Sequence, residues 1–291
     1  MLILFESPIQ LPRPLNFNMH FNMYREPVRI QNGRPRSGNE WTYGDLERYR
    51  ITVDYLDYDT FFTSISAPPA SRIHSDFLTC LDAEDAISGD ESAYTFIQYL
   101  ANAMSPPLGD ESTVNDFIVN LLRTLGFAPK KKFPLRTCGE MRFAQADVCI
   151  LDGTDPLLLI QEDHSRVDPL TDPIPPLIAA AIAAFDVAAS HRAKYQLPVR
   201  SSSDILGITF CGSWPTFFKI PSPENLANRV AHDDVDNPDL FFASVSAHSP
   251  RVSRPLKRLE EGMKPLDNRL LLLSALMRFK RMMFHLSGKS Q

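Results

Sequence analysis

Three side chains near the middle of the sequence are of types that support metal binding and acid–base chemistry: Asp147, Glu162 and His164. Asp147 precedes the apolar run 148–151, and Glu162 and His164 follow the apolar run 157–160. Because side chains alternate between the two faces of a strand, Glu162 and His164 should point to the same face. If the two runs pair as antiparallel strands, Asp147 and Glu162 can lie side by side.

Two carboxylates at the end of an apolar sheet repel each other and lose solvation, so a shared proton or cation stabilises them. Mg²⁺ or Mn²⁺ suits such a site, because hard divalent ions prefer oxygen ligands. The alternative is that the strand ends at Gln161 and that the charged residues after it are only exposed to solvent. A carboxylate followed two residues later by a basic side chain is a weak motif, so the spacing alone leaves both interpretations open.

The hydrophobic pattern predicts the strands that would hold these residues. The runs 146–151 and 157–164, separated by the turn-forming residues 152–156, indicate a β-hairpin. Residues 157–160 are apolar on both faces, which is typical of a central, buried strand.

Two helices are predicted on either side of this hairpin in the sequence. Residues 111–126 have one apolar face and end at Gly126. Glu111 lies along the buried edge of that helix, or it only complements the helix dipole. A second helix, from Leu177 to about Ala193, is rich in alanine, and its small side chains permit close packing on a sheet.

Length and composition are those of a soluble globular protein. A chain of 291 residues that is 44% hydrophobic can bury a full core. The net charge of −5 argues against a non-specific nucleic-acid coat protein but is compatible with a local basic groove. Basic clusters at 130–132, 251–258 and 278–281 are interpreted as solvated surface. Four cysteines without a C-x-x-C pair indicate no zinc framework, and no signal or membrane segment is found, so we expect an intracellular protein.

The N-terminal part differs from the rest in composition. Residues 1–40 contain five prolines and are expected to be partly disordered. Residues 41–66 are rich in aromatic side chains, for which we expect core packing against the main sheet. Stacking on bases or binding of a protein partner are the alternatives. We therefore predict an N-terminal extension over residues 1–104, of unknown role, and a main domain over residues 105–287.

The order of these elements resembles the PD-(D/E)XK nuclease-like superfamily, and is closer to a group of uncharacterised fungal proteins with that core. No single motif carries the resemblance; the order of all of them does, over roughly residues 105–285. The matching segments are Glu111-Ser112-Thr113-Val114, Ala146-Asp147-Val148-Cys149-Ile150, Gln161-Glu162-Asp163, Ile182-Ala183-Ala184-Phe185, Thr216-Phe217-Phe218-Lys219-Ile220 and Gly262-Met263.

The resemblance implies an α/β fold with a restriction-endonuclease-like core, in which helices flank a mixed sheet, plus an irregular, aromatic-rich N-terminal extension. It also implies metal ligands: Glu111, Asp147 and Glu162, with the backbone carbonyl of Asp163 as a further one. Mg²⁺ or Mn²⁺ held there polarises a phosphodiester and lowers the pKa of a bound water. This metal chemistry agrees with what the carboxylates suggest by themselves, without the resemblance.

The sequence departs from the superfamily at one catalytic position, where His164 replaces the usual lysine. A neutral imidazole supplies no fixed positive charge at pH 7, although an imidazolium or a general base partly substitutes for it. Two functions follow as hypotheses. One is a metal-dependent phosphodiesterase acting on DNA or RNA, with Glu162, His164 and Asp147 as catalytic residues. The other is a catalytically inactive nuclease fold that serves as a binding or scaffold module.

Overall fold

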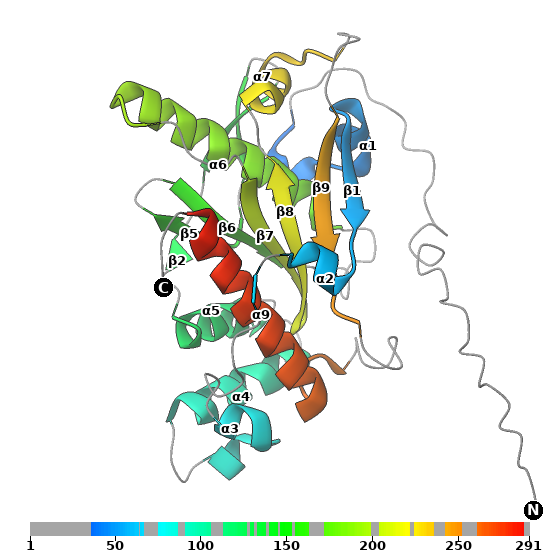
Figure 1. Ribbon diagram of the computed structural model, residues 1–291, viewed down its shortest axis with the longest axis vertical. Coiled ribbons are helices and arrows are strands. Elements are labelled where there is room, and N and C mark those ends of the chain that lie inside the picture. The colour runs from blue at the N-terminus through cyan, green and yellow to red at the C-terminus, as the bar shows by residue number, and fades with distance from the viewer. Residues whose placement is uncertain are drawn as a thin grey trace, which may run out of the picture. The chain divides into compact units, whose positions relative to one another are not determined.

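A seven-stranded mixed sheet forms the centre of the protein in the computed structural model (Figure 1). The strand order is β1-β9-β8-β7-β6-β5-β2, with parallel pairing in β1/β9 and β6/β7 and antiparallel pairing elsewhere. A separate antiparallel ribbon consists of β3 and β4. The strands are β1 (Ile51–Tyr55), β2 (Pro129–Lys130), β3 (Phe133–Thr137), β4 (Glu140–Ala144), β5 (Val148–Asp152), β6 (Asp155–Glu162), β7 (Asp204–Cys211), β8 (Trp214–Pro221) and β9 (Ala243–His248).

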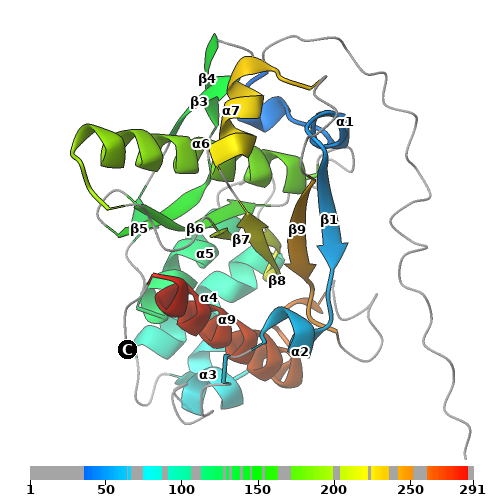
Figure 2. The same ribbon diagram turned by 45° about the horizontal axis from the view of Figure 1, so that its top comes forward.

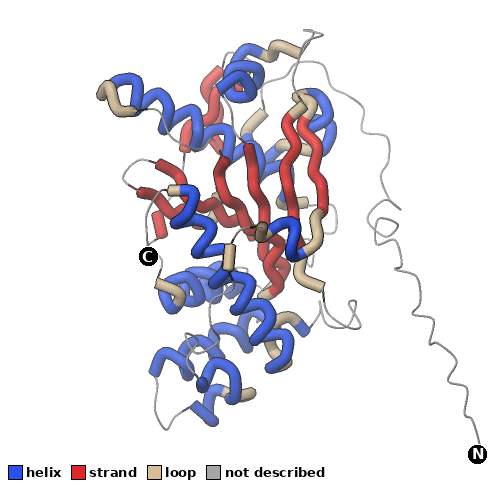
Figure 3. Tube along the Cα trace, viewed as in Figure 1, coloured by secondary structure: helices blue, strands red, loops and turns tan. Residues whose placement is uncertain are grey.

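Helices cover both faces of this sheet, as the secondary-structure colouring of Figure 3 shows. They are α1 (Tyr43–Arg48), α2 (Tyr58–Phe61), α3 (Ser75–Thr79), α4 (Glu91–Met104), α5 (Thr113–Thr124), α6 (Ile174–Lys194), α7 (Glu224–His232) and α9 (Leu266–Leu286), with short 3-10 helices η2 (Gly38–Glu40) and η4 (Ala83–Ala86). The structure describes residues 36–63, 65–66, 75–86, 91–105, 113–126, 129–130, 133–137, 140–144, 146–152, 155–162, 172–198, 204–221, 224–235, 242–251 and 261–287.

The sheet separates two hydrophobic cores. The α9-side core packs α2, α3, α4, α5 and α9 against one face, and the α6-side core packs α1, α6 and α7 against the other (Figure 2). Side chains of β6 alternate between the two faces of the sheet and so contribute to both cores. Leu158 and Ile160 join the α9-side core, and Leu159 joins the α6-side core. The predicted mixed α/β sheet with flanking helices is therefore confirmed.

Helix α6 packs closely on the sheet because the residues between them are small. Its stretch from Leu177 to Ala184 is almost completely buried. Gly207 of β7 lies beneath it, where a Cβ atom would come within 2.9 Å of a methyl group of Leu177. Among the described residues, α6 is the one helix long and apolar enough to cross a membrane, but most of it is buried inside the protein, as in the core helix of a soluble protein.

The predicted central hairpin and the helix before it are confirmed. β5 pairs antiparallel with β6, and β6 lies between β5 and β7, away from either sheet edge. In α5, four apolar side chains of one face are fully buried: Phe117, Ile118, Leu121 and Leu122. These elements are encoded by long local apolar patterns, which is why the sequence predicts them.

The N-terminal part is not a separate, irregular extension beyond residue 40. Residues Asn32–Gln291 form one compact unit, in which β1 is an edge strand of the main sheet. Four aromatic side chains expected to pack in the core are indeed buried: Trp41, Tyr49, Phe61 and Phe62. β1 pairs with β9, about 190 residues later, and no local pattern in the sequence reveals that pairing.

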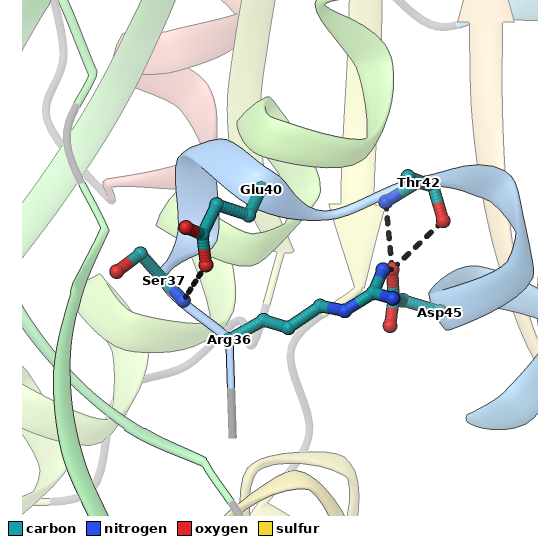
Figure 4. A network of polar contacts seen from close by, with 5 residues as sticks. All are labelled: Arg36, Ser37, Glu40, Thr42 and Asp45. Carbon is teal, nitrogen blue, oxygen red and sulfur yellow. Dashed lines mark hydrogen bonds and ion pairs between the residues drawn. The ribbon is translucent and has the colours of Figure 1, made fainter. Parts of the chain in front are cut away.

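Residues 36–48 are ordered by their own polar side chains, although residues up to 40 were expected to be partly disordered (Figure 4). The backbone N–H of Ser37 donates to Glu40 Oε2 at 3.0 Å, and that of Thr42 donates to Asp45 Oδ2 at 2.8 Å. Each is part of a capping box at the start of a helix. Arg36 adds an ion pair of 3.1 Å to Asp45. Residues 1–35, the rest of the expected lead-in, lie outside the described residues.

Helix α9 holds neighbouring segments through cationic side chains. Arg269, which is 1% exposed, donates to the carbonyls of Phe77 at 3.1 Å and Cys80 at 2.6 Å, at the end of α3. Arg278 donates to the carbonyls of Phe62 and Ile65, just after α2. The last carbonyls of a helix have no partner inside it and carry partial negative charge, so cations stabilise them.

Two more cations of α9 act in the same way. Lys280 donates to the carbonyl of Leu125 after α5, and Arg281 donates to Ser66 at 3.1 Å. The basic cluster 278–281, which the sequence suggested is only solvated surface, therefore also forms hydrogen bonds that hold other segments to α9. We call Arg269, Arg278, Lys280 and Arg281 the α9 clasp.

Candidate functional site

The register of the central hairpin places Asp147 opposite Gln161. Val148 pairs with Ile160, so the next residue along each strand is Asp147 on one side and Gln161 on the other. The two side chains are in contact, with Gln161 Nε2 donating to Asp147 Oδ2 at 2.9 Å. The sequence suggested Glu162 as the neighbour of Asp147; Glu162 is the following residue, where β6 ends, and its Cα pairs with Phe210 of β7.

A β-bulge produces this register. Ile150 pairs with Leu158 and Leu151 pairs with Pro156, which leaves Leu157 as an extra residue in β6. Leu157 and Leu158 are consecutive, yet both join the α9-side core, which strict alternation would not allow. Without the extra residue, counting from the turn would put Ile160 opposite Asp147. The bulge therefore replaces an apolar neighbour of the carboxylate with an amide.

Gln161 is the first polar residue after a fully apolar stretch of β6. A carboxylate only accepts hydrogen bonds, so the amide nitrogen must face Asp147 and the amide oxygen must point elsewhere. That oxygen, Oε1, is buried and has no hydrogen-bond partner in the described part of the protein. An unmade hydrogen bond of a buried oxygen costs roughly 1–3 kcal/mol. A cation or an ordered water would supply the missing partner.

The surroundings of Asp147 are apolar and offer oxygen rather than sulfur as a ligand. Ala146, Val148 and Cys149 beside it are buried. Burial raises the pKa of the Cys149 thiol to about 12, so the thiol stays protonated at neutral pH. The carboxylate and amide oxygens are the donor types that Mg²⁺ and Mn²⁺ prefer, so this part of the predicted site fits such an ion.

The structure describes part of the predicted ligand set. Asp147 is partly buried and lies just before β5, and the backbone of Glu162 ends β6. Glu111, Asp163 and His164 lie outside the described residues, as does the side chain of Glu162. Within the described ranges no group of three or more His, Cys, Asp or Glu side chains could hold a metal ion. That finding leaves the four undescribed side chains untested.

From the sequence, Gln161 was considered only as the residue where the strand could end. Two signals could have identified it: a polar residue directly after a buried apolar run, and its position next to a candidate ligand. The register that brings it to Asp147 could not be counted from the sequence, because the bulge changes the count.

Comparison with known proteins adds no relative to this description. A scan against protein-family models gives no match, and a search of curated proteins gives no significant one. The resemblance to the PD-(D/E)XK superfamily stays a prediction that rests on the order of residues and elements in the sequence.

Proposed function

We propose that this protein is a metal-dependent phosphodiesterase that cleaves DNA or RNA, built on a restriction-endonuclease-like core. The observation that carries the proposal is the hydrogen-bonded pair of Asp147 and Gln161, one residue before Glu162, at the end of two adjacent central strands. A carboxylate held in a fixed orientation in apolar surroundings, with a second acid one residue further along the neighbouring strand, is suited to binding a hard cation.

In this proposal each acidic residue has a defined task. Asp147 and Glu162 would hold Mg²⁺ or Mn²⁺, Glu111 would complete the set, and the carbonyl of Asp163 would be a further ligand. The bound ion supplies Lewis-acid polarisation of the phosphodiester and a water of lowered pKa. His164 would act as a general base, since a neutral imidazole can accept the proton of the attacking water. Burial of the flanking apolar residues excludes other water and strengthens these electrostatic interactions.

Calorimetric titration of Mg²⁺ and Mn²⁺ tests the proposal directly. The wild-type protein should bind Mn²⁺, and Glu162→Ala and Asp147→Asn should abolish binding and ion-dependent cleavage of labelled single- and double-stranded DNA and RNA. Glu47→Ala is a suitable control, because Glu47 is an exposed acid on α1, far along the chain from the hairpin. Cleavage that persists in purified Glu162→Ala would rule out the proposed site.

One observation favours a second candidate, the inactive nuclease fold used for binding or as a scaffold: the lysine position holds His164. This candidate predicts no binding of Mg²⁺ or Mn²⁺ below millimolar concentration and no cleavage by the wild-type protein. Cleavage that appears in His164→Lys would then identify a decayed active site.

A further inference from the structure

Gln161 makes a contact that neither the hairpin nor the core requires. β6 pairs with β5 as far as Ile160 and with β7 through Gln161 and Glu162, so β7 already holds its backbone at residue 161. The Gln161 amide donates instead to the carboxylate of Asp147, at 2.9 Å. It can do so because the bulge at Leu157 shifts the register by one residue. Bulges of this kind often re-aim side chains next to functional sites.

A hydrogen bond from an amide fixes the orientation of a carboxylate. In metal sites, such outer partners of a ligand keep it in the geometry that binds the ion. The buried oxygen of the same amide, Oε1, has no partner within the described residues, so it can accept a further hydrogen bond or face a cation. The hydrogen bond from Nε2 and the unpartnered Oε1 thus both support a role of Gln161 beside a bound ion.

We propose that Gln161 is a positioning residue, which orients Asp147 toward a divalent cation and faces that cation's surroundings with its own amide oxygen. This inference rests on the proposed function, since it requires an ion at Asp147. It adds a residue whose role neither the acidic spacing nor the resemblance indicated. A purely structural Gln161 would contribute to folding stability and leave the affinity for the ion unchanged.

The experiment compares two replacements of Gln161 that keep its length. Gln161→Met removes the amide, and Gln161→Glu replaces it with a carboxylate. For each, Mn²⁺ affinity is measured by calorimetry and thermal unfolding is followed in the presence of a chelator. Gln98→Met is the matched control, because Gln98 is exposed on α4. Glu162→Ala reports on the proposed site itself.

We expect Gln161→Met to weaken Mn²⁺ binding by about 10- to 100-fold, while the ion-free protein stays folded. Gln161→Glu should bind Mn²⁺ more tightly than Gln161→Met, since its second carboxylate faces the ion. Gln98→Met should match the wild type in both measurements.

Three results would overturn the inference. Unchanged Mn²⁺ affinity in Gln161→Met, with binding still lost in Glu162→Ala, would reject the role of Gln161 and keep the proposed function. Equal affinities for Gln161→Met and Gln161→Glu would show that the side chain does not face the ion. Absence of Mn²⁺ binding in the wild type would reject the proposed function and this inference together.

Discussion

The α9 clasp and the end of the central hairpin both place polar groups inside the protein, but they satisfy them differently. In the clasp, charged donors meet backbone carbonyls, and Arg269 alone binds four of them. At the hairpin end, Gln161 satisfies Asp147 while its own buried oxygen has no partner among the described residues. Within the described ranges, no buried side-chain atom of the clasp lacks a hydrogen-bond partner, which is the pattern of a structural element. The hairpin end is incomplete, which is the pattern of a site.

The largest effect on stability is expected from Arg269→Met in the clasp. This change leaves the buried carbonyls at the end of α3 without a charged donor, so the free energy of unfolding should fall by roughly 3 kcal/mol. Urea unfolding followed by circular dichroism measures it. Arg123→Met is the control, because Arg123 is exposed on α5, and should change stability by less than about 0.5 kcal/mol. Similar losses in both variants would mean that the clasp is not a structural centre.

A divalent ion should stabilise the hairpin end and leave the clasp unaffected. With free Mn²⁺ a hundredfold above its Kd, wild-type protein should gain about 2.7 kcal/mol of unfolding free energy. Arg269→Met should gain the same amount, since it shares no contact with Asp147 in the described structure, whereas Asp147→Asn should gain none. Denaturant unfolding with and without Mn²⁺ measures the gain. If Arg269→Met also lost it, the two regions would be coupled and the comparison would fail.

Gly262→Ala tests the turn that the clasp binds. Gly262 has φ of 58°, and an added Cβ would lie 2.2 Å from Ser213 Oγ and 2.7 Å from Met104 Sδ. We expect a loss of about 2 kcal/mol in thermal or urea unfolding. Gly126→Ala has the same kind of backbone strain, with φ of 75°, but its nearest neighbour is the flexible end of Lys280 at 3.1 Å. Its loss should be smaller, and an equal loss would show that crowding at Ser213 is unimportant.

The smallest expected effect is a loss of folding stability at acidic pH. The side chain of His248 lies on the α9 side and packs against Tyr58, Phe61 and Phe217. Burial lowers the pKa of His248 below its usual value of 6.5. The positive charge of Arg251 lowers this pKa further, whereas the hydrogen bond to the Leu56 carbonyl and the charge of Asp57 raise it. Above pH 6.5 the ring is neutral in both states. Below it, the unfolded chain takes up the proton first, so stability falls until pH reaches the folded-state pKa.

Urea unfolding between pH 8 and 5 measures this dependence, and His248→Leu should flatten it. A dependence that survives in His248→Leu would mean that the acid response does not belong to His248.

Local pattern was enough to predict the parts of the fold that carry long apolar runs. β6 and α6 are each encoded by one continuous apolar run and are buried as expected, because a long apolar run predicts burial without any information on distant partners. β1 is only five residues long, and its partner β9 is distant in sequence, so its place in the sheet depends on tertiary pairing. The clasp was missed for a related reason, since an arginine in the sequence does not show which carbonyl it will meet.

The two strands that carry Asp147 and Glu162 were predicted correctly, but the residue opposite Asp147 was not. The approximate position of Asp147 follows from the hairpin, and the hairpin follows from its turn residues. Whether Ile160, Gln161 or Glu162 lies opposite Asp147 depends on one bulged leucine, and a shift of one residue exchanges the two faces of a strand. The predictions for Glu111, Asp163 and His164 concern side chains outside the described residues and await the metal titration.

The position of α9 in the chain has a consequence for the order of folding during synthesis. Helix α9 comes after every segment that the clasp binds, and β9 likewise comes long after β1. A ribosome-bound chain that lacks α9 would expose the ends of α2, α3 and α5 together with the apolar face of β5 to β8. Contacts between distant segments form slowly, and such faces aggregate while they wait. Chaperone binding to nascent chains should therefore persist until α9 has emerged.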